Sequence, residues 1–181
     1  MNILIFYLFN LFLRVLTPKR LITEIREIQK EQKKQKENNE TPNFLLKPEQ
    51  SNIYRWKAII AGQEETPFYQ KYYRVDIRCP ETYPMKPPTV RFVTPIFHPN
   101  IHFKTGEVCL DILKTDWSPA WDIMAICRAV HLLLRHPEPK SPLNCFAGNI
   151  LRSNDQLAYN SMGKMYAEIY GYNSFEEAEQ K

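Results

Sequence analysis

The sequence predicts an α+β domain in which helices lie outside an antiparallel sheet. Near the N-terminus, apolar residues recur at helical spacing, and a run of strand-like segments separated by turn residues follows. Two further helical segments come after a long irregular stretch. Because the strands occur in one run, with the helices before and after them, the strands are expected to pair as hairpins and the helices to cover the sheet.

The first helix is predicted to begin at Pro18, because proline is tolerated in a first helical turn. Its apolar positions are Leu21, Ile22, Ile25 and Ile28, which fall on one face. The polar residues that follow predict that this helix ends before the first strand.

The middle of the chain contains three segments with strand character. They are rich in bulky apolar residues and each ends at glycine or proline. The predicted strands are Arg55–Ala61, Gln70–Cys79 and Thr89–Val93. The stretch from His98 to Thr115 has no sustained period, so we expect irregular chain with at most a short strand at Glu107–Leu110.

Two helices are predicted in the C-terminal half. Ile123–Arg135 is apolar almost all round and is expected to be buried. The final helix is expected at Asp155–Tyr170. Its predicted buried stripe consists of Leu157, Met162, Met165, Tyr166 and Ile169.

The length of 181 residues suits one domain with short extensions. We expect an apolar N-terminal extension at 1–16, a domain at 17–172 and a polar C-terminal tail at 173–181. The apolar part of the extension is shorter than the roughly 20 residues that cross a bilayer and is interrupted by Asn10 and Arg14. It is expected either to pack on a partner or a membrane surface, or to be a short membrane anchor, unless the start codon is misassigned.

Composition excludes several classes of function. The 24 basic and 20 acidic residues are intermixed, so no basic stripe for nucleic acid is predicted. The four cysteines, Cys79, Cys109, Cys127 and Cys145, contain no CxxC pair, which argues against a zinc site and against a disulfide framework. Reduced thiols of the cytosol or nucleus are the simplest interpretation.

The irregular stretch contains Cys109 near the turn residue Gly106 and the amide of Asn100. A loop on a rigid scaffold is the usual place for a reactive thiol, and an amide can donate to a developing oxyanion. Three chemistries compete with an inert buried cysteine: a thiol nucleophile without a histidine base, a hydrolase using His98 or His102, and a metal cluster of these histidines with Cys109. The metal cluster lacks a fourth ligand, and the hydrolase lacks the motifs known around such cysteines.

From Lys19 to Tyr170 the chain resembles the ubiquitin-conjugating enzyme family. The resemblance is carried, in order along the chain, by Trp56, Ile60, Gly62 and Thr66-Pro67-Phe68, by Tyr83-Pro84 with Pro87-Pro88, by His98-Pro99-Asn100, by Gly106–Leu113, and by Trp117-Ser118-Pro119-Ala120. It implies the ubiquitin-conjugating fold, an antiparallel four-stranded sheet flanked by helices, for the 17–172 catalytic domain.

The resemblance implies that Cys109 receives ubiquitin from a ubiquitin-activating enzyme as a thioester and passes it on with a RING-type ligase. One thioester is exchanged for another, and a thiol is intrinsically nucleophilic, so no dedicated base is required. ATP is used upstream by the activating enzyme. No Gly-rich phosphate loop is present, so no cofactor and no metal are expected.

Other site residues take roles by the same resemblance. Asn100 is expected to stabilise the oxyanion or to order the loop, while His98 and Pro99 are expected to be structural. Asp111 could orient an incoming nucleophile or restrain the thiol. Many members carry an acid where this chain has Ser141, so the preference for lysine as acceptor is open. The ligase-binding positions implied are Lys19, Arg20, Met85, Lys86, Ser118, Pro119 and Ala120.

Several local motifs resemble the fungal peroxisomal branch of the family. They are His102–Gly106, Trp117–Trp121, Ser141–Asn144 and Gly148–Leu151. That branch modifies the cargo-import receptor on cysteine so that the receptor is recycled, together with a membrane-anchored peroxin, at the cytosolic face of the peroxisome. The alternatives are a conjugating enzyme for another ubiquitin-like protein or for general cytosolic substrates, and a noncatalytic ubiquitin-binding variant, although such variants lack the cysteine.

Overall fold

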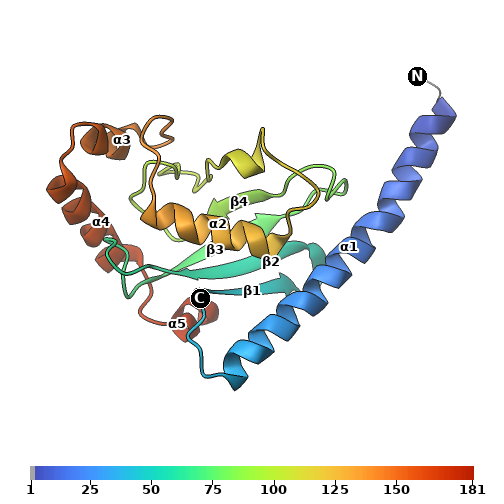
Figure 1. The fold of residues 1–181 in the computed structure, drawn as a ribbon, viewed down its shortest axis with the longest axis horizontal. Helices are drawn as coiled ribbons and strands as arrows, with labels where there is room; N and C mark the ends of the chain where they lie inside the picture. Colours follow the sequence, from blue (N-terminus) through green and yellow to red (C-terminus); the bar gives the residue numbers. More distant parts are fainter. Residues whose placement is uncertain (1–2) are drawn as a thin grey trace.

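The computed structural model describes the backbone of residues 3–181 and the side chains of residues 18–181. One long helix precedes the sheet, and a short 3-10 helix and four α-helices follow it (Figure 1). The elements are α1 (Ile3–Glu37), β1 (Phe44–Glu49), β2 (Asn52–Ala61), β3 (Tyr72–Arg78), β4 (Thr89–Phe92), η1 (Asp111–Leu113), α2 (Ile123–Arg135), α3 (Cys145–Arg152), α4 (Gln156–Tyr170) and α5 (Phe175–Gln180).

The sheet has the order β1-β2-β3-β4, and each neighbouring pair is antiparallel. Alternate residues of β2 and β3 point to the core, as the pleat of a strand requires. These core residues are Trp56, Ala58, Ile60, Tyr73, Val75 and Ile77. Helix α2 lies across this inner face, and α1 runs along the side next to β1 (Figure 1). The predicted fold class is therefore confirmed.

Helix α1 differs from its prediction, because it does not begin at Pro18 but contains it. Proline lacks an N–H and so removes one helical hydrogen bond, yet the helix continues on both sides of it. The N-terminal half of α1 projects beyond the sheet (Figure 1). The prediction that residues 1–16 contact a partner or a membrane depends on side chains that lie outside the described residues. Within the described part of the chain, no helix is long and apolar enough to cross a membrane.

Strand β1 was missed by the sequence analysis, because Lys47-Pro48 suggested a loop. A proline is tolerated at a sheet edge, where its missing N–H breaks no ladder bond. Here β1 is an edge strand that pairs with β2, and its register shifts between Pro48 and Glu49. The short strand expected at Glu107–Leu110 is reduced to two isolated bridges, in which Glu107 pairs with Arg91 and Val108 with Ile101.

Helix α4 has nearly the predicted bounds, but the predicted buried stripe is largely wrong. Leu157 is 79 % exposed, Met165 46 % and Ile169 61 %. The helix packs instead through a neighbouring face that includes Gly163 and Ala167. A Cβ on Gly163 would lie 2.6 Å from Cγ of Pro67, so the small residue permits close contact with the loop before β3.

The expected polar tail at 173–181 is in part the helix α5, which packs on the outer face of the sheet. The Ser174 side chain caps it by accepting the Glu177 N–H. Ala178 is 1 % exposed, and the Phe175 ring lies 4.4 Å from the Tyr72 ring, centroid to centroid. The polar composition concealed a narrow apolar face, so this correction extends the folded domain to α5.

Candidate active site

Cys109 lies in the irregular segment between β4 and η1, as a partly exposed thiol. Its backbone N–H donates to the Asn100 carbonyl at 2.9 Å, which holds the segment against the body of the protein. Cys79 and Cys127 are buried, and burial raises the pKa of both thiols. The inert-cysteine alternative therefore fits these two positions and does not fit Cys109.

A tight turn before Cys109 requires a glycine. Gly106 has φ +69°, and a Cβ there would lie 1.9 Å from the Phe92 carbonyl oxygen. The Gly106 N–H donates to the His102 carbonyl at 2.8 Å, and the His102 N–H donates to the Glu107 carbonyl at 2.9 Å. The positive φ and the lack of space both exclude larger residues, so this turn sets where the following thiol emerges.

Asn100 is 2 % exposed, and its side chain both donates a hydrogen bond to Glu138 and accepts one from it. Its Nδ2 donates to the Glu138 carbonyl at 2.7 Å, and its Oδ1 accepts the Glu138 N–H at 2.8 Å. Glu138 belongs to the proline-rich turn that carries Ser141. The geometry supports loop ordering for Asn100, while its role toward an oxyanion stays a prediction.

His98 is fully buried and uses both ring nitrogens. Its Nδ1 accepts the Asn100 N–H at 3.2 Å, so its Nε2 carries the proton and donates to the Leu133 carbonyl at 3.0 Å. Burial lowers the pKa of this imidazole to about 3. His98 is therefore a neutral structural group without access to solvent, and the hydrolase alternative that uses it as a base does not fit.

Two neighbours reinforce the same loop. The Pro99 carbonyl accepts the N–H groups of Leu143 and Asn144 at 2.8 and 2.9 Å. The Nδ1 atom of His102 accepts the Thr105 N–H at 3.1 Å, so this nitrogen bonds within the turn that contains both residues. Within the part of the chain that the structure describes, no group of three or more His, Cys, Asp or Glu side chains could hold a metal ion.

Asp111 and Ser141 are both exposed, Asp111 at the start of η1 and Ser141 in the turn after α2. The Asp111 carbonyl accepts the N–H groups of Lys114 and Asp116, so its backbone shapes the turn after the thiol. The roles assigned to these two side chains stay predictions.

Lys114 was missed by the sequence analysis. Its Nζ donates to Sγ of Cys109 at 3.2 Å. A separation of five residues matches neither helical nor strand spacing, and the contact arises because η1 turns the chain back. The only signal available was a basic residue shortly after the nucleophile.

One buried carboxylate, that of Glu24, joins the elements on which the residues expected to contact a ligase lie. Glu24 on α1 is 2 % exposed; it accepts the Tyr83 hydroxyl at 2.7 Å and the Ile123 N–H at 2.9 Å, and it pairs with Arg20 at 2.5 Å. Arg20 also donates to the Trp121 carbonyl at 3.2 Å. This carboxylate therefore joins α1, the loop after β3 and the start of α2.

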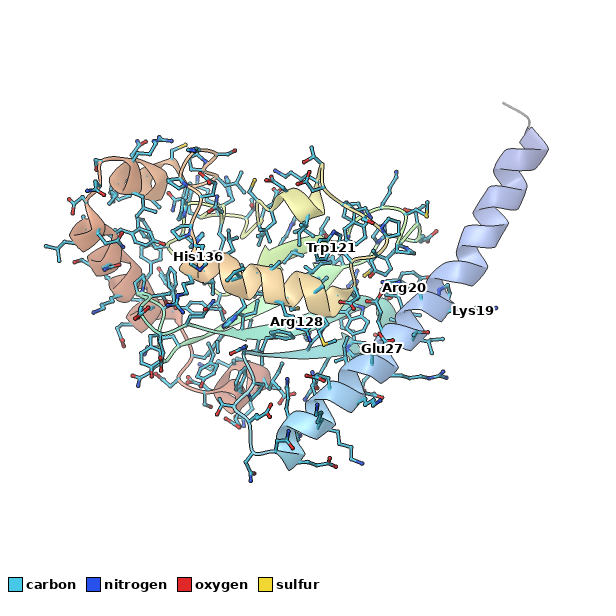
Figure 2. The ribbon with its side chains drawn as sticks, viewed as in Figure 1. Lys19, Arg20, Glu27, Trp121, Arg128 and His136 are labelled. Carbon is cyan, nitrogen blue, oxygen red and sulfur yellow. The ribbon has the colours of Figure 1, made fainter. Side chains whose placement is uncertain are left out.

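A further bond joins the two loops at this end of the molecule, because Trp117 Nε1 donates to the Pro84 carbonyl at 2.9 Å. Arg20 lies on the side of α1 that faces the loop containing Trp121, and Lys19, the preceding residue, points away from it (Figure 2). The remaining expected ligase-binding residues are exposed on these loops: Met85, Lys86, Ser118, Pro119 and Ala120.

The sequence model described as ubiquitin-conjugating enzyme matches residues 24–167. The chain belongs to the ubiquitin-conjugating enzyme family, and it is a transferase that acts through a cysteine thioester.

Within that family, similar proteins include peroxin-4 enzymes. Protein PEROXIN-4 of Arabidopsis thaliana is 52% identical over 128 residues, which are 71% of this chain and 82% of the relative. Ubiquitin-conjugating enzyme E2 pex4 of Dictyostelium discoideum is 50% identical over 135 residues, 74% of this chain and 91% of the relative. The H. polymorpha ubiquitin conjugating enzyme Pex4p, solved in complex with the soluble domain of Pex22p, has a TM-score of 0.78 at 33% identity and covers 86% of this chain and 98% of its own. The resemblance to the peroxisomal branch is thereby confirmed.

Proposed function

We propose that Cys109 carries ubiquitin as a thioester and that the enzyme transfers it to the peroxisomal cargo-import receptor. The observation that supports this most is the partly exposed thiol, held by Asn100 on the segment that the family motifs surround. The similarity to peroxin-4 proteins supports the peroxisomal assignment. A RING ligase and a membrane-anchored peroxin would act with it at the cytosolic face of the organelle, and this would serve receptor recycling and import.

In the loading step, Cys109 Sγ attacks the thioester carbonyl of the ubiquitin held by the activating enzyme. The activating enzyme's thiolate leaves, so the number of thioesters is unchanged. The reaction needs no strong base, which agrees with the neutral, buried state of His98. Because the activating enzyme has already used ATP, this chain requires neither a nucleotide nor a metal for the step.

The acceptor is proposed to be a cysteine of the target. An unperturbed thiol has a pKa of about 8.5, whereas that of an ammonium group is about 10.4. A thiol therefore needs less help in losing its proton. Ser141, which is exposed on the turn held by Asn100, offers a hydroxyl where many relatives offer a carboxylate.

A loading and discharge experiment tests this proposal. Ubiquitin, activating enzyme and ATP should form an adduct that is sensitive to reductant in wild type and absent in Cys109→Ala. Loaded enzyme is then mixed with free cysteine or free lysine. Ser141→Asp should raise discharge to lysine relative to cysteine, on the order of tenfold, because a carboxylate assists loss of the ammonium proton.

The outcomes separate the alternatives. No adduct under conditions that load another conjugating enzyme would overturn the proposal, and an adduct formed only with the activating enzyme of another ubiquitin-like protein would support that alternative. An unchanged ratio of cysteine to lysine discharge in Ser141→Asp would contradict the role given to Ser141.

A further inference from the structure

The outer face of the sheet, which is turned away from α2, carries a dense group of positive charges that the proposed function does not use. Side chains alternate between the two faces along a strand, so the outward residues of β1–β4 are those that alternate with the buried core positions. The cations among them are called the basic face: Lys47, Arg55, Lys57, Arg74, Arg78 and Arg91. The carboxylates at outward positions of the same strands are Glu49 and Asp76. Positive charge is therefore concentrated on this one side of the sheet.

Two pairs of these cations face each other directly across neighbouring strands. Lys47 is opposite Lys57, and Arg55 is opposite Arg78. The Cβ atoms of directly opposed residues lie about 4.5–5.5 Å apart, and like charges in this position destabilise a sheet. Four of the six cations form no salt bridge with any side chain of residues 18–181, the described ones: Arg55, Lys57, Arg74 and Arg91. Such an arrangement costs stability and would be relieved by a negatively charged ligand.

The chain's own C-terminal helix indicates which kind of segment this face accepts. Helix α5 contains Glu176, Glu177 and Glu179, and it packs on the outer side of β2 and β3. Glu179 pairs with Lys47 and so supplies a negative charge to one of the two like-charge pairs. Ile59, an apolar outward residue of β2, is only 8 % exposed beside this helix. An acidic segment with an apolar side therefore already covers part of the outer face.

Space for a second segment of this kind lies next to α5. The cleft of about 670 Å³ between α5 and the sheet is lined in part by the apolar side chains of Leu45 and Ile59 and in part by the cations Lys57 and Arg74. Beyond the cleft, the basic face continues across β3 and β4. Because the cleft is concave, it suits a protein segment better than the flat surface of a membrane.

We propose that the basic face and the cleft next to α5 bind an acidic segment of a partner protein. Carboxylates of the segment pair with the cations, and an apolar side chain enters the cleft. Attraction between opposite charges speeds association and weakens as salt is added. The surface includes none of the positions expected to contact a ligase, so the enzyme would hold this partner and the ligase at the same time.

Substitution of Arg55 separates binding from folding. Arg55→Glu places a carboxylate opposite Arg78, so an attractive pair replaces a repulsive one. This variant should unfold at a higher temperature than wild type and yet bind an acidic segment more weakly. Arg74→Glu reverses a charge in the lining of the cleft itself. Lys30→Glu, at an exposed position of α1, makes the same change of charge away from the sheet and is the matched control.

The test measures, by fluorescence anisotropy, binding of a labelled peptide to the full-length protein. The peptide consists of glutamates on both sides of a central leucine, and the same peptide with glutamine in place of glutamate is the control probe. Wild type and Lys30→Glu should bind the acidic peptide, with a dissociation constant that rises with salt. Arg55→Glu and Arg74→Glu should each raise this constant by roughly fivefold to tenfold, because a repulsive contact replaces an attractive one.

Equal binding of the two peptides would overturn the proposal, as would equal effects of Lys30→Glu and the two arginine variants. No binding of the acidic peptide at low salt would overturn it as well. If vesicles containing phosphatidylserine then bound wild type and not the arginine variants, the ligand of the face would be a membrane. The measurement requires no thioester, so its outcome is independent of the proposed function of Cys109.

Discussion

At the scale of single residues, the site depends on buried polar side chains that are hydrogen-bonded. His98 and Asn100 are almost inaccessible, and each bonds to backbone groups of a different segment. An unpaired buried polar group costs about 1–3 kcal/mol, so these pairings favour one arrangement of the loop. The Cys109 thiol is more exposed than the residues that hold its segment.

Burial of His98 should make the folded state sensitive to acid. Its pKa is lowered from 6.5 to about 3, so below pH 6.5 the unfolded state binds a proton that the folded state does not. The free energy of unfolding is therefore highest above pH 6.5 and falls as the pH is lowered toward 3. From this group alone, the free energy of unfolding should fall by about 2 kcal/mol between pH 7 and pH 5. Urea unfolding of wild type and His98→Gln at these pH values measures the difference, since the Gln amide can still donate to Leu133. Parallel losses in the two proteins would contradict the assignment.

At the scale of elements, the Glu24 carboxylate connects α1, the loop that carries Tyr83 and the N-terminus of α2. Its charge has a direct partner in Arg20, and desolvation of the Tyr83 hydroxyl beside it raises the pKa of that tyrosine. A carboxylate with this many donors is stabilised in spite of its burial.

Replacing Glu24 with Gln should therefore loosen the end of the molecule that is expected to contact a ligase. The variant should lose about 1–3 kcal/mol of the free energy of unfolding, because charged hydrogen bonds become neutral. Discharge stimulated by a RING ligase should fall more than discharge without one. Glu27→Gln, an exposed position on the same helix (Figure 2), is the control and should change neither. Equal effects of the two substitutions would refute the connection.

Elements were predictable where local signals agreed. Helix α2 has the predicted bounds, and the Asp122 side chain caps its first turn. The exposed side of α4 was mistaken for its buried side, because apolar periodicity does not reveal which face a neighbour covers. The true contact uses Gly163, whose role depends on the nearby Pro67, far away in the sequence. Helix α3 was missed because its eight residues are too short to show a period.

The candidate site was predictable to the extent that family motifs reach. Those motifs identified Cys109, and its partial exposure agrees with that choice. The bond partner of Asn100 is 38 residues away, and the contact of Lys114 depends on how η1 turns. Such contacts belong to tertiary structure, so no local pattern in the sequence announces them.

At the scale of the whole molecule, the sheet is covered on both faces, by α2 on the inner side and partly by α5 on the outer side. A cleft of about 670 Å³ remains between α5 and the outer face, lined by residues such as Ile59 and Arg74. Lys47 on β1 pairs with Glu179, which ties the C-terminal helix to the sheet edge. The C-terminal segment thus contributes to the stability of the domain.

Ala178→Asp should detach α5 from the sheet. A carboxylate would replace a side chain that is 1 % exposed, and the loss should be about 2 kcal/mol or more in the free energy of unfolding. Thioester loading of the folded fraction should be unchanged, because Cys109 is not on this helix. Gln180→Asp, at an exposed position of α5, is the control for the added charge. Equal thermal midpoints for the two variants would show that α5 contributes nothing.

The two hydrogen bonds between the Asn100 side chain and the Glu138 backbone have a consequence for the entropy cost of each reaction cycle. The backbone of Asn100 holds the thiol segment, and its side chain holds the turn opposite. If the two loops were unordered, ordering them at every transfer would cost conformational entropy. Here both loops are ordered once, during folding, so binding of an acceptor costs only the entropy of the acceptor itself. The segment that carries Cys109 and the turn that carries Ser141 are therefore held in one arrangement relative to each other.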